Sequence, residues 1–65
     1  MTYKIYHVFS NNLDEWYESI SDAWRTYRIW AKENGTARLY EEDRQAPNGE
    51  VLEENCLASY GQYPS

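Results

Sequence analysis

The stretch from Ser19 to Gly35, SISDAWRTYRIWAKENG, decides the fold because it has the periodicity of one amphipathic helix. At about 100° per residue, a group of apolar side chains falls within about 40° of one line along this helix. The group consists of Ile20, Trp24, Tyr27 and Ala31, with Ala23 and Trp30 on its flank. We predict that this stripe packs against a sheet formed by the rest of the chain.

Both ends of the predicted helix carry capping signals. Ser19 followed by Asp22 has the spacing of a capping box, in which a hydroxyl and a carboxylate bind amide groups of the first turn. At the other end, Asn34 precedes Gly35, and glycine adopts the left-handed conformation of a C-cap without a steric cost. We therefore predict that the helix begins at Ser19 and is closed by Asn34-Gly35.

Two strands are predicted before the helix. The segment 3–9, YKIYHVF, is rich in β-branched and aromatic residues, and large apolar groups on both of its faces leave open which face is buried. Ser10-Asn11-Asn12 is typical of a turn because asparagine tolerates positive φ. The segment 15–18 then completes a hairpin as a short strand. The alternative is a helix that begins early, near Leu13.

Two more strands are predicted after the helix. The segment 36–42 alternates polar with small or apolar residues and turns Ala37 and Leu39 toward the helix. The segment 45–49, QAPNG, has the strongest turn signal, since proline presets φ and Asn-Gly supplies positive φ. The return strand covers residues 51–59, with Cys56 and Ala58 facing inward. The order β-β-α-β-β predicts the α+β class, a small antiparallel sheet with one amphipathic helix packed across it.

Length and composition limit the classes of protein. The 65 residues predict a single compact domain with a frayed tail at residues 61–65. The single cysteine excludes an internal disulfide, and the chain shows no leader pattern and no apolar run of the roughly 20 residues that span a bilayer. We therefore expect a cytoplasmic protein that does not bind membranes. Seven tyrosines exceed what so small a core can bury, which favours a protein interface.

The charge is concentrated on the second predicted hairpin. The net charge of −5 disfavours direct binding to nucleic acid and favours a basic partner. Like charges placed across a strand pair destabilise it, so stability does not explain the carboxylates of this hairpin. The alternative is that they keep the hairpin soluble and protect an edge strand. The predicted partner-binding residues are Glu41, Glu42, Asp43, Glu50, Glu53 and Glu54, together with Tyr40.

The helix carries a basic stripe beside its apolar face, formed by Arg25, Arg28 and Lys32. We expect these side chains to pair within the chain. Their candidate partners are Asp14, Glu15, Glu18 and Asp22. Ile29 lies opposite the apolar stripe and is expected to be exposed, which a lone apolar side chain tolerates.

No catalytic or metal-binding motif stands out. His7 and Cys56 are the only histidine and the only cysteine, and they could form a dyad only if the first and fourth strands were adjacent. A small buried thiol beside a strand histidine is the simpler interpretation. These two residues are too few for zinc, and the chain has no Asp-x-Asp-x-Asp-Gly calcium loop. We therefore expect no enzyme, no cofactor and no metal.

The leading hypothesis is a non-enzymatic, acidic protein-binding module that docks on a basic surface of another protein, such as a nucleic-acid-binding protein. Small acidic proteins of phages and mobile elements include inhibitors that present carboxylates in place of DNA phosphates, and the analogy rests on size and charge alone. The alternative hypothesis is a small structural or regulatory subunit that self-associates, as in a homodimer, through its sheet or its tyrosine-rich surface.

The predicted helix end can be tested by substitution. Gly35→Val is expected to lower the free energy of unfolding, because a β-carbon obstructs the left-handed cap, whereas Glu33→Ala is expected to be nearly silent. Amide hydrogen exchange locates the end of the helix directly. Helical protection that continued through Thr36 and Ala37 would contradict the predicted cap.

Overall fold

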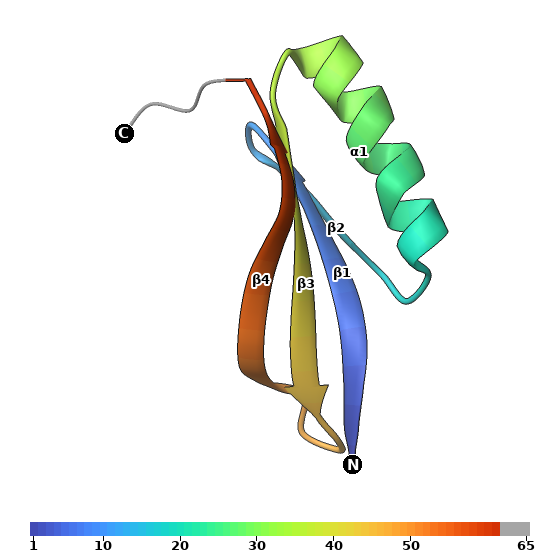
Figure 1. The fold of residues 1–65 in the computed structure, drawn as a ribbon, viewed down its shortest axis with the longest axis vertical. Helices are drawn as coiled ribbons and strands as arrows, with labels where there is room; N and C mark the ends of the chain where they lie inside the picture. The colour runs from blue at the N-terminus through green and yellow to red at the C-terminus, as the bar shows by residue number, and fades with distance from the viewer. Residues whose placement is uncertain (62–65) are drawn as a thin grey trace.

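The protein forms a four-stranded antiparallel sheet with one helix on one face. The computed structural model describes residues 1–61, so Gly61 is the only residue of the predicted tail 61–65 within the described part. The elements are β1 (Thr2–Ser10), β2 (Leu13–Tyr17), α1 (Ile20–Asn34), β3 (Ala37–Gln45) and β4 (Glu50–Tyr60). The strand order in the sheet is β2-β1-β3-β4 (Figure 1). The predicted β-β-α-β-β fold is therefore confirmed.

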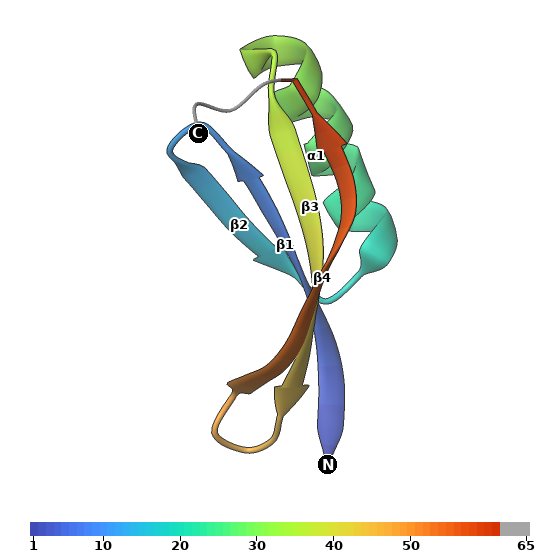
Figure 2. The same cartoon turned by 60° about the vertical axis from the view of Figure 1, so that its left-hand side comes forward.

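The helix covers only one half of the sheet. The core beneath it is formed by Val8 of β1, Leu39 of β3 and Ala23 of α1, all fully buried, with Tyr6 beside them. Beyond the helix, β1, β3 and β4 continue together as a twisted three-stranded ribbon (Figures 1 and 2). We call this ribbon the arm and define it as residues 2–5 and 41–54.

Both predicted helix caps are present. The Ser19 hydroxyl accepts a hydrogen bond from the Asp22 amide at 3.4 Å. Gly35 has a φ of 76°, and its amide donates to the Ala31 carbonyl at 3.0 Å. The Asp22 carboxylate lies 3.8 Å from Arg25 of the next turn. The hydroxyl half of the capping box and the glycine C-cap are thus confirmed.

The buried stripe of α1 differs from the predicted one at its first residue. Ala23 and Ala31 are buried, and Trp24, Tyr27 and Trp30 pack partly buried against the core. Ile20, however, is 45% exposed, so its predicted burial is wrong. The reason is its position: α1 follows the short strand β2 directly, and its first turn stands away from the sheet (Figure 1). Ile29 is exposed, as predicted.

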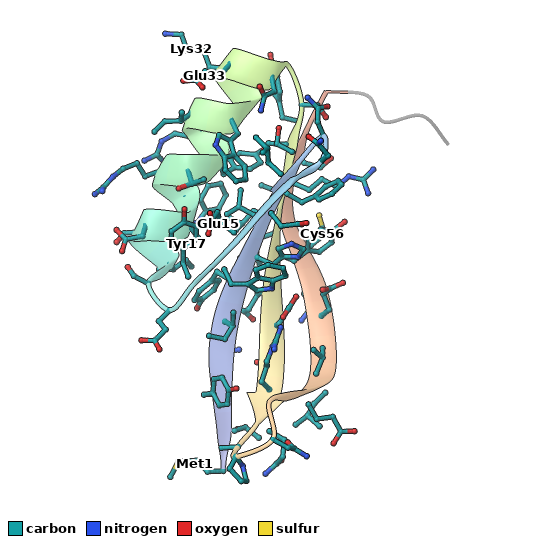
Figure 3. All side chains as sticks on the ribbon, turned by 180° about the vertical axis from the view of Figure 1, so that it is seen from behind. Met1, Glu15, Tyr17, Lys32, Glu33 and Cys56 are labelled. Carbon is teal, nitrogen blue, oxygen red and sulfur yellow. The ribbon has the colours of Figure 1, made fainter. Side chains whose placement is uncertain are left out.

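The two hairpins follow the predicted turn signals. Asn11 has a φ of 55° between β1 and β2, and the strand that begins at Leu13 excludes the alternative of an early helix start. In the second hairpin Gly49 has a φ of 74°, and the Ala46–Pro47 peptide bond is cis. The Ala46 amide donates to the Met1 carbonyl at 2.8 Å, so the turn is fixed to the start of β1 (Figure 3).

A β-bulge in β4 overturns the prediction for Cys56. Leu39 pairs with Ala58, but the next residue of β3, Tyr40, pairs with Cys56, so Leu57 is an extra residue. An extra residue reverses the alternation of side chains between the two faces of a strand. Ala58 therefore packs against the core as predicted, whereas Cys56 is exposed on the face away from α1 (Figure 3).

A buried serine joins the ends of three elements. Ser10 of β1 is fully buried, and its hydroxyl donates to the Thr36 carbonyl at 2.6 Å while it accepts from the Asn34 side chain at 2.9 Å. The end of β4 reaches the same place, because a β-carbon on Gly61 would lie 2.2 Å from the Gly35 carbonyl oxygen. The sheet is thus fixed to the C-terminal end of the helix by polar contacts.

Removing this hydroxyl should weaken the fold. Ser10→Ala is expected to lower the free energy of unfolding by about 1 to 3 kcal/mol, because it leaves the buried Thr36 carbonyl and Asn34 amide without their shared partner. The matched control is Ser59→Ala, an exposed position on β4, with an expected change within about 0.5 kcal/mol. Urea denaturation of the variants measures both values. An equal effect at the two positions would show that the buried hydrogen bonds contribute nothing specific.

Candidate functional site: the acidic arm and the open face

The sheet has one face that the helix does not cover, which we call the open face. The register places His7 of β1 beside Trp16 of β2 and Tyr40 of β3 on this face. The same alternation brings Tyr3, Ile5 and Phe9 to the open face. Trp16 and Tyr3 keep 50% and 40% of their surface exposed. The open face is therefore rich in aromatic side chains, of which Trp16 and Tyr3 are exposed.

The predicted partner-binding carboxylates are divided between the two faces of the arm. Glu42 pairs with Glu54 and Asp43 pairs with Glu53, so acidic residues do oppose each other as the sequence indicated. Because side chains alternate along a strand, these two pairs point in opposite directions. Glu42 and Glu54 lie on the open face. The acidic hairpin is thus two separate groups of charge.

On the helix side of the sheet, a lysine bridges two carboxylates. Lys4 Nζ lies 2.9 Å from Asp43 Oδ1 and 3.0 Å from Glu41 Oε1. Hydrogen bonds to Asp43 and then to Glu41 raise the pKa of Lys4, which keeps the ammonium group charged. The sequence did not indicate this bridge, because Arg44 is the only basic residue within residues 41–54 and Lys4 lies far away in the sequence. Lys4 reaches the hairpin because β1 pairs with β3.

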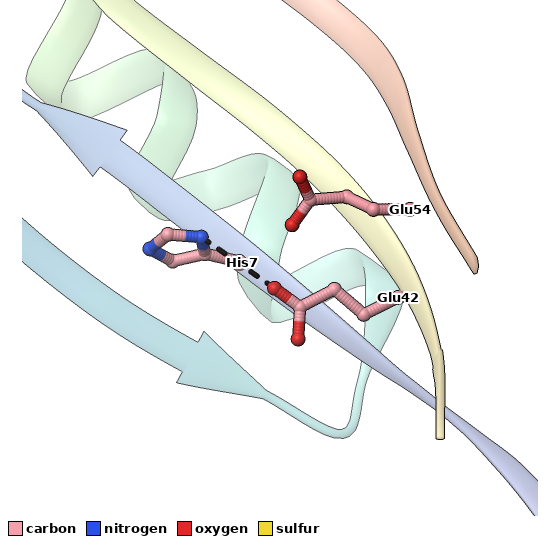
Figure 4. Close-up of side chains that lie close together, drawn as sticks. All are labelled: His7, Glu42 and Glu54. Atoms are coloured by element: carbon pink, nitrogen blue, oxygen red, sulfur yellow. Dashed lines mark ion pairs between the residues drawn. The ribbon is translucent and has the colours of Figure 1, made fainter. Parts of the chain in front are cut away.

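On the open face, Glu42 is buried and paired. It is only 4% exposed, and its Oε1 atom accepts hydrogen bonds from Arg44 Nε at 3.0 Å and from Arg44 Nη2. Its Oε2 atom lies 3.7 Å from His7 Nδ1 (Figure 4). Glu42 is therefore turned inward and offers almost no surface to a partner.

Glu54 lies next to this buried carboxylate. Although the residue as a whole is exposed, its carboxyl group extends toward Glu42 and His7 (Figure 4). Desolvation, followed by a hydrogen bond with Glu42 and the negative charge of Glu42, raises the pKa of Glu54. The two carboxyl groups therefore interact closely, and Glu54 is easier to protonate than an isolated glutamate.

His7 is held in one orientation by two contacts. Its ring stacks on Trp16, with ring centroids 4.4 Å apart and an angle of 3° between the planes. Its Nε2 atom lies 2.7 Å from Asp14 Oδ1.

The geometry excludes a catalytic dyad of His7 and Cys56. Their strands, β1 and β4, are separated by β3, and Tyr40 lies between the two residues in the register.

The arm also carries an open depression and exposed apolar side chains. The depression has a volume of about 410 Å³ and is lined by Thr2, Tyr3, Lys4, Asp43, Leu52 and Glu53. Val51 and Leu52 of the edge strand β4 are 47% and 51% exposed. Acidic and apolar surface therefore lie side by side on the arm.

The remaining predicted residues take other positions. Tyr40 is half-buried on the open face, where its hydroxyl accepts a hydrogen bond from Arg38 at 3.3 Å. On the helix, Arg25 lies 3.8 Å from Asp22, so one of the expected pairs is present. Arg28 and Lys32 have no ion pair with any residue of the described range 1–61 and are exposed.

Comparisons with known proteins do not assign this chain to a family or a function. No protein-family model, curated protein or solved structure is significantly similar to this chain. Within residues 1–61, no helix has the length and apolar character needed to cross a membrane. The function proposed below therefore rests on the geometry and charge of the molecule alone.

The buried pair of Glu42 and Arg44 gives a stability test. Arg44→Met is expected to lower the free energy of unfolding by about 2 to 4 kcal/mol, because it leaves the Glu42 carboxylate buried without its main partner. Adding Glu42→Met is expected to recover part of this loss. Arg25→Met, which removes an exposed pair, should change stability by less than about 1 kcal/mol. Equal losses for Arg44→Met and Arg25→Met in thermal unfolding would contradict the structural role of Glu42.

Proposed function

We propose that this protein is a non-enzymatic binding module that docks its arm onto a basic surface of another protein. The observation that carries the proposal is the concentration of charge on a projecting element. The arm holds six carboxylates against Lys4 and Arg44, so its charge is −6 + 2 = −4 out of a total of −5. The helix does not cover this ribbon (Figure 2). Such a field attracts basic partners and accelerates their association.

The surface chemistry of the arm supports a protein partner. A lysine or arginine side chain could enter the depression, with its aliphatic part on Leu52 and its charge beside Glu53, since Lys4 already pairs with Asp43. Exposed Val51 would supply apolar contact at the same edge. Apolar contact surrounded by charged groups is the usual anatomy of a protein interface. Because the depression is open, it does not provide the enclosed pocket that acid–base catalysis requires.

The most specific form of the proposal is an inhibitor. Carboxylates spaced along a ribbon can replace the phosphates that a basic nucleic-acid-binding groove contacts. In that case the partner is a nucleic-acid-binding protein, and the module competes with its ligand. A cytoplasmic location is part of the same proposal, since Cys56 carries an exposed free thiol of the kind that a reducing compartment maintains.

Self-association is the competing hypothesis. Pairing of β4 with β4 of a second copy would place one strand that carries Glu50, Glu53 and Glu54 beside another, and like charges across a strand pair are unfavourable. The open face is the better candidate for a homodimer, because Trp16, which does not line the depression, remains exposed there. The two hypotheses therefore use different surfaces and can be separated.

The test reverses charge on the arm without touching its buried groups. The variant is Glu50→Lys with Glu53→Lys, both exposed, and the matched control is Glu18→Lys with Glu33→Lys, both exposed elsewhere. Each pair changes the net charge by +4, from −5 to −1. Affinity capture from a lysate of the source cell, followed by mass spectrometry, should retain one partner with the parent and the control. The arm variant should lose it.

Salt and folding controls complete this test. Retention by the parent should fall as ionic strength rises, because surface charges are screened over about 8 to 10 Å near physiological salt. Circular dichroism establishes that both variants are folded. Equal retention by the two variants would refute the arm as the interface. A parent protein that sediments as a dimer, and becomes monomeric in Trp16→Ser, would favour self-association through the open face.

A further inference from the structure

We infer that His7, Glu42 and Glu54 form a binding site for one divalent first-row transition metal ion, of which zinc is the best candidate. The three residues come from β1, β3 and β4 and meet on the open face (Figure 4). One ligand atom from each lies within 4.8 Å of the other two. This inference does not rest on the proposed function, because it concerns a different class of ligand and its test measures metal binding, although Glu42 and Glu54 also count toward the charge of the arm.

The orientation of His7 suits a metal ligand. Its Nε2 atom lies 2.7 Å from Asp14 Oδ1, and an ionised carboxylate can only accept, so Nε2 carries the hydrogen. In the neutral ring, Nδ1 then has a free lone pair that faces Glu42. Histidine ligands of metals commonly donate their other N–H group to a carboxylate in this way. Stacking on Trp16 fixes the plane of the ring.

His7 and Glu42 do not hydrogen-bond to each other, and their facing atoms lie near the spacing of two metal ligands. His7 Nδ1 and Glu42 Oε2 are 3.7 Å apart, which is too long for a hydrogen bond. Two ligands of a tetrahedral zinc ion lie about 3.3 Å apart, given bond lengths of about 2.0 Å. Arg44 occupies Oε1 of Glu42, so Oε2 is the oxygen left to bind an ion. Rotation of the exposed Glu54 side chain can bring the third ligand closer.

The donor set selects the class of ion. An imidazole nitrogen with two carboxylates suits zinc and other first-row transition metals, whereas calcium and magnesium prefer oxygen ligands alone. Because Arg44 already pairs with the buried Glu42, the ion would compensate mainly the charge of the opposed Glu54. It would also join three neighbouring strands across the open face. Binding to the folded state alone would raise the thermal stability of the protein.

The experiment titrates the untagged chain of 65 residues with zinc chloride. Isothermal titration calorimetry should give one ion per chain, and the imidazole C–H signals in proton NMR should shift with it. Since His7 is the only histidine, these signals need no assignment. Cobalt(II) should occupy the same site and give a visible absorption spectrum, and zinc should displace it.

Single substitutions then locate the site. Glu54→Gln is expected to weaken zinc binding at least tenfold, and Asp14→Asn by about 10- to 100-fold through loss of the orienting carboxylate. The matched control is Glu53→Gln, the adjacent residue on the opposite face with the same change of charge, which should leave affinity unchanged. Circular dichroism checks that each variant is folded.

Three outcomes would overturn the inference. The first is the absence of any shift of the His7 signals at saturating zinc. The second is an equal loss of affinity in Glu53→Gln and Glu54→Gln, or equally tight binding of calcium, because either would indicate general attraction to an acidic surface. The third is loss of zinc binding in Cys56→Ser with binding retained in Glu54→Gln, which would move the ion to the exposed thiol.

Discussion

One short helix must stabilise a sheet that is longer than itself. The 15 residues of α1 span about 22 Å, whereas the molecule extends 37 Å along its longest axis. A continuous apolar core can form only where the two overlap, around Val8 and Leu39. The rest of the sheet has no second layer. Everything outside this overlap, including the arm and the whole open face, depends on contacts made within the sheet itself.

Charge pairs take the place of a core in the arm. Lys4 bridges Glu41 and Asp43 on one face, and Arg44 holds Glu42 on the other. Exposed charge pairs contribute little to the free energy of unfolding. A buried pair acts mainly by raising the free energy of any conformation in which the two charges are apart. The core cluster lies outside the arm, so the charge pairs of the arm act mainly against arrangements that separate them. This arrangement lets a narrow ribbon keep a large negative charge while its strands stay in register.

The sequence predicts local structure well and relations between strands less well. The caps at Ser19 and Gly35 follow from local chemistry, so their positions were predictable. Cys56 was misplaced because one extra residue in β4 reverses the alternation, and no residue type announces a bulge. The cluster around His7 was missed for a related reason. Its members meet only because β1 pairs with β3, which in turn pairs with β4, and strand order is not encoded in any single segment.

The alternation of side chains gives the arm two separate chemical surfaces. Glu53 and Asp43 belong to the proposed partner surface, whereas Glu54 and Glu42 face His7 on the other side. A divalent ion between the latter two would change the charge of the arm from −4 to −2 without covering the depression. Its effect on a basic partner would therefore act through the electrostatic field alone. Because linkage is reciprocal, a partner that prefers the more negative arm must weaken binding of the ion by the same factor.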